Sequence, residues 1–545
     1  MRKSLLVWSF TILAAVAFAP SAVAQQSCES LSTLKLSHTT ITSSTVVPEK
    51  PFTATRPGTP PGPTVTLPAH CEVKGVAKPT EDSEIKFEVW LPMSGWNGKY
   101  QQVGNGGWAG SIPTASMAAP LRRGYVTAGT DDGHTGGNGA VWAMGHPEKL
   151  IDFGYRAVHE TAEQAKAVIH AFYGKGQSFS YFFGCSDGGR EALMEAQRYP
   201  ADFNGIIAGA PANFWSRLLT DAVWNAQALD QSPASFIPPN KLAAIQKAVL
   251  DACDTVDSVK DGVIEDPRRC HFDPTVLKCK DGDGPDCLTG PQVDALRKIY
   301  DGPTNPRTGE HIFPGATPGT EAVPGNWALW ITGTAPGRSL QFMFGNTFYS
   351  HVVFEDLKWD YHTLNLDRDF KLADEKAGPV LNSDNPDLRP FRDRGGKLIQ
   401  YHGWGDAAIP PLSSINYYDQ VTSFLAKDRP ARGKPASVSD FYRLFMVPGM
   451  GHCAGGVGAN TFGNVGGTAS DPDHDIVSAL EQWVERGAAP AKIIATGHAR
   501  GEGIKEVAVT HPLCPYPQVA HWKGTGDTSD ATNFECVDEK PAKKP

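Results

Sequence analysis

Two short segments far apart in the sequence each place a cysteine beside a residue that could take part in acyl transfer. Segment 184–188 (GCSDG) has Cys185 immediately before Ser186, and segment 451–453 (GHC) has Cys453 immediately after His452. A serine nucleophile and its histidine base must lie within hydrogen-bond reach of each other. A disulfide between the two cysteines would therefore join the two halves of one active site. The pair of segments predicts a serine hydrolase.

The sequence around Ser186 predicts the strand, turn and helix that position such a nucleophile. Residues 178–183 are short and aromatic, like a buried strand, and residues 190–197 are strong helix formers. The intervening G-x-S-x-G sequence suits the sharp turn that exposes the serine. The same pattern also occurs in glycine-rich turns with a capping serine, and the flanking strand and helix favour the nucleophile.

The neighbouring segments predict the fold class. Residues 158–172 carry apolar side chains at helical spacing, and residues 204–210 read as a further buried strand. Strands that alternate with helices form a parallel sheet. The expected fold class is α/β, with a mostly parallel sheet.

The histidine and the acid that would complete a triad each follow a later strand-like segment. His452 lies in a glycine-rich loop after residues 441–448, and it stands out among the 16 histidines because Cys453 mirrors Cys185. Asp406 ends the sequence HGWGD, which follows residues 397–401. Asp406 would orient the imidazole and stabilise its charged form, although a turn aspartate or a helix cap also fits. The order Ser, Asp, His is that of α/β-hydrolases.

Length and composition permit this interpretation. The chain has 545 residues, of which 40% are hydrophobic and 20% charged. This length exceeds what a single hydrophobic core usually serves. The formal net charge of −9 makes nucleic acid and anionic membrane surfaces poor partners. Residues 1–24 have the pattern of a secretory signal peptide, with two basic residues, an apolar run and small residues at its end. That run is shorter than the ~20 residues of a membrane anchor.

Ten cysteines in an exported protein are most simply five disulfides, although the sequence alone does not fix their connectivity. Closeness in sequence suggests four pairs and leaves Cys185 with Cys453. A zinc site is disfavoured because no CxxC pair is present and the His159-Glu160 start lacks the second histidine of HExxH. The four suggested pairs are Cys28 with Cys71, Cys253 with Cys270, Cys279 with Cys287, and Cys514 with Cys536.

Three segments together resemble the tannase and feruloyl esterase family, which also contains a hydrolase of mono(2-hydroxyethyl) terephthalate. They are 184–191 (GCSDGGRE), 391–406 (FRDRGGKLIQYHGWGD) and 447–453 (VPGMGHC), and the likeness runs from about Cys28 to Cys536. The resemblance implies an α/β-hydrolase core, a large inserted lid and a disulfide that joins the neighbours of the serine and the histidine. We assign 25–212 and 391–536 to the catalytic domain, 213–390 to the lid and 537–545 to a flexible tail.

The oxyanion of the tetrahedral intermediate requires two backbone N–H donors. One is expected from Asp187, the residue after the nucleophile. The resemblance places the other at Gly107, within the glycine-rich segment 103–110 (VGNGGWAG). A tight turn after a strand explains the same glycines, and both interpretations are compatible.

Segment 253–264 (CDTVDSVKDGVI) is rich in carboxylates and contains a glycine, which suits an oxygen-preferring cation such as calcium. The EF-hand pattern fails, because a valine stands where the second loop carboxylate belongs. The resemblance implies a structural calcium site in the lid, and a solvated acidic loop is the alternative. The implied ligands are the side chains of Asp254, Asp257 and Asp261 and the carbonyls of Val259 and Val263.

The resemblance also implies the substrate class, an aromatic acid ester. Feruloyl and other hydroxycinnamoyl esters come first, galloyl esters second and a terephthalate half-ester third. Trp404 within HGWGD favours feruloyl esterases, since the terephthalate enzyme has another residue there. A catalytically silent hydrolase fold and an acyltransferase are the alternatives. No organic cofactor and no membrane anchor are expected, and a signal peptide implies a secreted or periplasmic protein of undetermined oligomeric state.

Overall fold

The structure is a computed structural model that describes residues 26–54, 62–137, 139–427, 437–466, 471–497 and 509–538. The predicted signal peptide, 1–24, lies outside these residues. So does 539–545 of the predicted tail.

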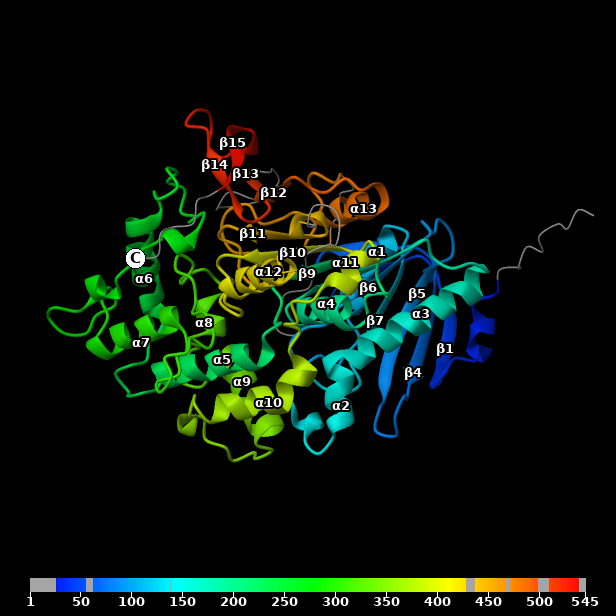
Figure 1. Cartoon of the computed structure of the whole chain (residues 1–545), viewed down its shortest axis with the longest axis horizontal. Helices are drawn as coiled ribbons and strands as arrows, with labels where there is room; N and C mark the ends of the chain where they lie inside the picture. Colours follow the sequence, from blue (N-terminus) through cyan, green and yellow to red (C-terminus); the bar gives the residue numbers. More distant parts are fainter. Residues whose placement is uncertain are drawn as a thin grey trace, which may run out of the picture.

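A nine-stranded sheet forms the centre of the molecule (Figure 1). Strands β7, β6, β8, β9, β10 and β11 run parallel to one another, and β1, β4 and β5 extend the sheet as antiparallel strands. The fold is therefore α/β with a mostly parallel sheet, as the sequence predicts. The strand order is β1 (Thr39–Val47), β4 (His70–Ala77), β5 (Ile85–Pro92), β7 (Val126–Thr130), β6 (Lys99–Val103), β8 (Phe179–Cys185), β9 (Gly205–Gly209), β10 (Lys397–Gly403) and β11 (Tyr442–Val447).

Alternate residues of the central strands pack on opposite faces of the sheet, because successive side chains of a strand point in opposite directions. Phe182 and Ile206 join one core cluster, with residues of α3 (Ala157–Tyr173), α4 (Asp187–Arg198) and α12 (Leu412–Leu425). Tyr181 and Ile207 join another, with residues of α13 (Ile476–Arg486). Helix α1 (Thr114–Arg122) also packs on β6 and β7, and α2 (Pro147–Ile151) precedes α3. The sheet is thus covered on both faces.

The helix after Ser186 begins at Asp187, three residues earlier than helix propensity predicts. The difference arises at Gly188 and Gly189, which are poor helix formers. A Cβ on Gly189 would lie 2.3 Å from the carbonyl oxygen of Gly209, so close packing of α4 on β9 requires glycine there. The predicted helix 158–172 and the predicted strands are present, with ends that differ by at most two residues.

Between the adjacent strands β9 and β10 the chain makes a long excursion in which the structure places helices and no strand. Figure 1 shows these helices, apart from the last one, as a group at the side of the sheet. The predicted lid, 213–390, corresponds to this region, and its exact limits stay a prediction because α11 spans the expected boundary. The helices are α5 (Trp215–Leu229), α6 (Leu242–Cys253), α7 (Gly290–Asp301), α8 (Trp327–Trp330), α9 (Leu340–Thr347), α10 (Asp369–Leu381) and α11 (Arg389–Asp393).

Three small antiparallel sheets lie outside the central one. The last of them corrects the predicted tail, because Val537 pairs with Val519 and Asp538 pairs with Gln518. The disulfide from Cys536 holds this strand, so the ordered chain continues past residue 536. The sheets consist of β2 (Lys50–Thr53) with β3 (Thr64–Leu67), β12 (Ile493–Gly497) with β13 (Val509–Leu513), and β14 (Gln518–Trp522) with β15 (Phe534–Asp538).

The structure forms five disulfides in the pairing that the sequence suggests. They are Cys28–Cys71, Cys185–Cys453, Cys253–Cys270, Cys279–Cys287 and Cys514–Cys536. In the part of the chain that is described, none of the helices is both long enough and apolar enough to cross a membrane.

Candidate active site

Ser186 occupies a strained turn between β8 and α4. Its backbone has φ of 68° and ψ of −121°, a combination that residues other than glycine rarely adopt. The flanking glycines make the turn possible, since a Cβ on Gly184 would lie 2.2 Å from the carbonyl oxygen of Gly188. A Cβ on Gly188 would lie 2.9 Å from the carbonyl oxygen of Asn105. The spacing of the G-x-S-x-G sequence therefore has a steric cause here.

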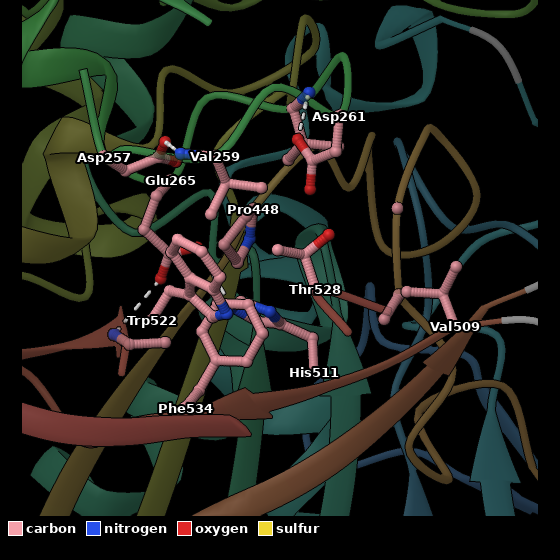
Figure 2. Close-up of a pocket in the computed structure, with 14 residues that line it drawn as sticks. Asp257, Val259, Asp261, Glu265, Pro448, Val509, His511, Trp522, Thr528 and Phe534 are labelled. Carbon is pink, nitrogen blue, oxygen red and sulfur yellow. Dashed lines mark hydrogen bonds and ion pairs between the residues drawn. The ribbon is translucent and has the colours of Figure 1, made fainter. Parts of the chain in front are cut away.

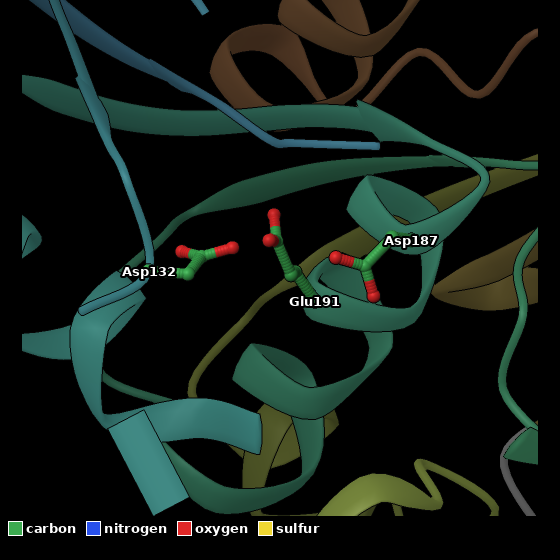
Figure 3. A group of neighbouring side chains, drawn as sticks. All are labelled: Asp132, Asp187 and Glu191. Atoms are coloured by element: carbon green, nitrogen blue, oxygen red, sulfur yellow. The ribbon is translucent and has the colours of Figure 1, made fainter. Parts of the chain in front are cut away.

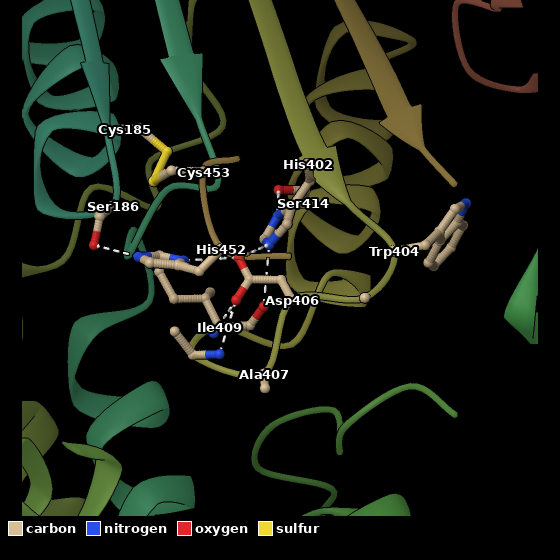
Figure 4. A network of polar contacts seen from close by, with 12 residues as sticks. Cys185, Ser186, His402, Trp404, Asp406, Ala407, Ile409, Ser414, His452 and Cys453 are labelled. Atoms are coloured by element: carbon tan, nitrogen blue, oxygen red, sulfur yellow. Dashed lines mark hydrogen bonds and ion pairs between the residues drawn. A yellow bond between two sulfur atoms is a disulfide. The ribbon is translucent and has the colours of Figure 1, made fainter. Parts of the chain in front are cut away.

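Ser186, His452 and Asp406 come together from three different loops at the ends of neighbouring strands (Figure 4). The distance from His452 Nε2 to Ser186 Oγ is 2.9 Å, and that from His452 Nδ1 to Asp406 Oδ2 is 2.8 Å. Asp406 is buried, whereas Ser186 and His452 are partly exposed. A hydroxyl, an imidazole and a carboxylate in this order can transfer a proton from the serine to the histidine.

The Asp406 carboxylate is held by four donors. Its Oδ1 accepts hydrogen bonds from the backbone N–H groups of Ala408 (2.8 Å) and Ile409 (3.0 Å). Its Oδ2 accepts from His452, and the Nε2 atom of His402 lies 3.2 Å away. Burial alone would raise the pKa of Asp406, yet His452 and the hydrogen bond from His402 hold it well below its ordinary value. Asp406 is therefore an anion throughout the working range of an esterase.

The disulfide between Cys185 and Cys453 joins the turn of Ser186 to the loop of His452. The two Cα atoms are 6.0 Å apart although 268 positions separate the residues in sequence. Figure 4 shows the bond next to the Ser186–His452 pair. The covalent link thus acts directly on the two groups that must exchange a proton.

The glycine-rich segment at 103–110 lies against the turn of Ser186. The Gly188 N–H donates to the carbonyl oxygen of Asn105 (2.9 Å), and the Gly104 N–H donates to that of Phe183 (2.9 Å). Within the described residues, no protein acceptor takes a hydrogen bond from the N–H of Gly107 or of Asp187. Gly107 has φ of +62°, and Asp187 begins α4, so both N–H groups remain available to a ligand.

Behind this loop lies a buried group of carboxyls that the sequence analysis missed. Asp132, Asp187 and Glu191 offer oxygen atoms within 4.8 Å of one another (Figure 3). Burial raises the pKa of Asp187 to about 7 and that of Asp132 well above its ordinary value, with the charge of Glu191 adding to both shifts.

The contacts of this carboxyl group indicate support for the loop rather than a separate metal site. Arg190 Nε donates to Asp187 Oδ1 (2.5 Å), which supplies one positive charge. Glu191 Oε2 accepts the Asn105 N–H at 3.0 Å, so the carboxyls connect α4 to the glycine-rich loop. Asp132 lies more than 50 positions before the motif in sequence, and no local pattern marks it.

Two aromatic side chains of the inserted helices lie beside the candidate triad. The Trp330 ring meets the His452 ring edge to face, with centroids 5.0 Å apart. The Phe344 ring is nearly parallel to that of Trp330 at 6.4 Å, and it lies within 3.2 Å of the position that a Cβ on Gly107 would take. Both rings are partly exposed, as Ser186 is. They therefore lie beside His452 and the Gly107 loop, the two parts of the candidate site that an ester bound at Ser186 would contact.

Trp404, whose presence in HGWGD favoured feruloyl esters, is not placed to contact an acyl group at Ser186. Figure 4 shows its side chain pointing away from Ser186 and His452. The ring is 4% exposed and lies under the guanidinium of Arg268, with 5.6 Å between the Arg268 Cζ atom and the ring centroid. Trp404 thus contributes to the junction of the inserted region with the core.

The acidic segment of the inserted region borders a cavity near the C-terminal strands (Figure 2). Four of the five expected calcium ligands line it, namely Asp257, Val259, Asp261 and Val263, together with Glu265 and His511. Burial raises the pKa of Asp257 to about 6 and also raises that of Asp261. A bound cation would offset the energetic cost of burying these two negative charges. Asp254 is not among the lining residues, and its Oδ1 accepts the Gly262 N–H at 2.9 Å.

The sheet, the strained serine turn and the Ser–His–Asp geometry define an α/β-hydrolase. Comparison with known proteins identifies the family within this class. The family model described as "Tannase and feruloyl esterase" matches residues 71–537. An uncharacterized esterase from Xanthomonas campestris is 45% identical over 97% of this chain and 94% of its own length. A probable feruloyl esterase B-2 from Aspergillus terreus is 33% identical over 86% of each chain.

Solved structures give the same assignment. Feruloyl esterase B from Aspergillus oryzae has a TM-score of 0.82 at 30% identity and covers 94% of this chain and 99% of its own. Tannin acyl hydrolase from Aspergillus niger has a TM-score of 0.72 at 23% identity, with 92% of each chain covered, and supports the fold. The chain belongs to the tannase and feruloyl esterase family, and it is a carboxylic ester hydrolase.

Proposed function

We propose that this esterase hydrolyses esters of hydroxycinnamic acids, with feruloyl esters foremost, through an acyl-enzyme on Ser186. The observation that carries the substrate class is the likeness, over nearly the whole chain, to proteins named feruloyl esterases at 30% identity or above. The arrangement of Ser186, His452 and Asp406 supports the mechanism.

The first step is attack by Ser186 Oγ on the ester carbonyl carbon. His452 Nε2 accepts the hydroxyl proton, and Asp406 stabilises the resulting imidazolium. The carbonyl oxygen becomes an oxyanion, and the N–H groups of Gly107 and Asp187 donate to it. Collapse of this intermediate breaks the ester bond, and the leaving alcohol takes the proton from His452.

The second step uses water in place of the serine. His452 removes a proton from the water as it attacks the acyl carbon, the same oxyanion forms, and Ser186 leaves with the proton. The free acid and the resting enzyme result. Trp330 and Phe344 favour a flat acyl group, because aromatic rings pack well against one another in offset and edge-to-face arrangements.

Galloyl esters are the second candidate, because the family includes tannases. A substrate profile separates the two. Turnover would be measured on methyl ferulate, methyl gallate and a terephthalate half-ester, with added alcohol to detect acyl transfer. We expect methyl ferulate to have the highest kcat/KM and the free acid to be the main product.

Ser186→Ala is the variant that tests the nucleophile. We expect turnover to fall by a factor of roughly 10⁴ or more while the melting temperature changes little, since only the reacting oxygen is removed. A Ser186→Ala enzyme with near-normal ester hydrolysis would falsify the mechanism.

We also propose that the protein is exported. Five disulfides form in the fold, and such bonds persist in oxidising compartments. The signal-peptide pattern of residues 1–24 leads to the same location.

We further propose that segment 253–264 of the inserted region binds a structural calcium ion. The carboxylates of Asp257 and Asp261 and the carbonyls of Val259 and Val263 border one cavity, and oxygen ligands of this kind suit calcium. Asp254 would act by fixing the loop through Gly262, or as a ligand after a small shift. A bound ion would offset the charges of the carboxylates and would take no part in the acyl transfer.

A further inference from the structure

A second imidazole contacts the carboxylate of the candidate triad. His402 Nε2 lies 3.2 Å from Asp406 Oδ2, the oxygen that also accepts from His452 (Figure 4). His402 is fully buried, and it does not reach Ser186. The proton transfers of the proposed mechanism need one histidine. The role of the other follows from its hydrogen bonds.

A buried chain of hydrogen bonds leads to the far nitrogen of His402. The Tyr442 hydroxyl of β11 donates to Gln400 Oε1 of β10. Gln400 Nε2 donates to Ser414 Oγ of α12 at 2.6 Å, and Ser414 Oγ lies 2.7 Å from His402 Nδ1. All four side chains are buried from solvent.

In the orientation that the structure gives the Gln400 amide, these hydrogen bonds run in one direction. An amide oxygen can only accept, so the Tyr442 hydroxyl must donate to Gln400, which leaves the Gln400 N–H for Ser414. The Ser414 hydroxyl proton then has one acceptor among the described contacts, which is His402 Nδ1. In this arrangement His402 Nδ1 accepts the hydrogen bond from Ser414 and carries no proton of its own.

The other nitrogen of His402 must carry a proton. Its neighbours are the carbonyl oxygen of Ile409 at 3.0 Å and the Asp406 carboxylate at 3.2 Å, and both can only accept. His402 is thus neutral, with its hydrogen on Nε2. On the Nε2 side of His402, the titratable groups are Asp406 and, beyond it, His452. On the Nδ1 side, α12 places the uncharged Ser414 next to the ring, and Tyr442 of β11 is connected to it through Gln400.

We propose that His402 is a positioning residue, kept neutral by the Tyr442–Gln400–Ser414 chain so that it orients Asp406 without competing for its charge. A cationic His402 would neutralise Asp406 and remove the stabilisation that the His452 imidazolium receives. A neutral donor fixes the orientation of the carboxylate, and the negative charge of Asp406 stays available to stabilise the His452 imidazolium. This proposal rests on the proposed role of Ser186, His452 and Asp406.

Ser414→Ala tests the proposal, because it removes the proton donor at His402 Nδ1 and so permits protonation there. We expect kcat on a phenyl ester to fall about tenfold near pH 6 and only about twofold near pH 8, with KM little changed. A loss of packing alone would lower kcat by the same factor at every pH.

Ser413→Ala is the matched control. Ser413 is a buried neighbour on the same helix whose hydroxyl has no hydrogen-bond partner in the structure. Its pH profile should match that of the unmodified enzyme. A pair of His402 variants adds a second measurement. His402→Gln keeps a neutral N–H donor and should retain more of kcat than His402→Leu does.

A Ser414→Ala profile parallel to that of the unmodified enzyme, or equal losses in the two His402 variants, overturns the proposal. Imidazole ¹⁵N spectra that show a charged His402 at the pH of full activity overturn it as well. If Ser186→Ala is inactive while these results are negative, the esterase mechanism stands and the role of His402 alone fails.

Discussion

Trp330 and Phe344 give the candidate site a preference that the triad itself does not provide. A serine, a histidine and an aspartate act on any ester that reaches them, so selectivity must come from groups beside the acyl chain. The Trp330 ring already contacts His452, and Phe344 lies against the loop of Gly107. An aromatic acyl group at Ser186 would meet both rings.

We therefore expect Trp330→Ala to raise KM for methyl ferulate by roughly tenfold, the equivalent of one lost aromatic contact. KM for a short acetyl ester should change much less, because an acetyl group does not reach the ring. Leu329→Ala is the control, since Leu329 belongs to the same short helix and is 46% exposed. Initial rates on both esters would show the effect, and equal changes for the two would argue against a role in selectivity.

The two kinds of site residue differ in how far the sequence reveals them. Ser186, His452 and Asp406 stand in short motifs that follow strands, so local patterns single them out, and the structure brings them within hydrogen-bond distance of one another. Trp330 and Phe344 are two among 13 tryptophans and 25 phenylalanines. Which of these rings faces Ser186 depends on the path of the inserted chain, and no local pattern encodes that path.

At the scale of elements, the strands of the core and the helical character of the inserted region were predictable, whereas the limits and the packing of the inserted helices were not. Strands β8 and β9 are short runs rich in aromatic or aliphatic residues, and β10 has a mixed sequence with apolar residues near its start, so composition indicates β8 and β9 more clearly. The inserted region consists of helices of 4 to 15 residues joined by loops. Their packing depends on apolar contacts, disulfides and polar contacts between residues that are distant in sequence. The start of α4 was misplaced because Gly188 and Gly189 serve close packing at the expense of helix propensity.

The acidic loop of the inserted region yields a prediction at this scale. Removal of calcium with a chelator should lower the melting temperature by roughly 2–3 °C, because an ion at a hundredfold excess over its Kd adds about 2.7 kcal/mol and a chain of this length unfolds with an entropy of about 1 kcal/mol per kelvin. Re-addition of calcium should restore it, and kcat measured well below the transition should not change.

Asp257→Asn and Asp251→Asn provide the comparison for this loop. Asp257 lines the cavity, whereas the Asp251 side chain on α6 is 65% exposed and pairs with Lys247 at the surface. Asp257→Asn should abolish the response to the chelator, and Asp251→Asn should keep it. A chelator response that survives in Asp257→Asn would place the ion elsewhere.

At the scale of the whole molecule, the Cys185–Cys453 bond closes a loop that contains the entire inserted region. The 268 positions between the two cysteines include all the helices between β9 and β10 and two further disulfides. Without the bond, the turn of Ser186 and the loop of His452 would be held together by non-covalent contacts alone. The bond therefore bears on both stability and catalytic geometry.

These two roles are separable by comparison with a disulfide that does not touch the site. Cys279–Cys287 closes a span of 8 positions within the inserted region. Chain entropy alone predicts a loss of about 5.6 kcal/mol when the longer loop is opened and about 2.5 kcal/mol when the shorter one is opened. Both double alanine variants should thus melt at lower temperatures than the unmodified enzyme.

Activity at a temperature where both variants remain folded distinguishes them. Cys185→Ala with Cys453→Ala should lower kcat/KM by roughly tenfold or more, because a small displacement between Ser186 and His452 slows proton transfer steeply. Cys279→Ala with Cys287→Ala should keep nearly full kcat/KM. If the first variant lost stability while its kcat/KM stayed intact, the packing of β8 and β11 would suffice to align the two groups, and the bond would serve stability alone.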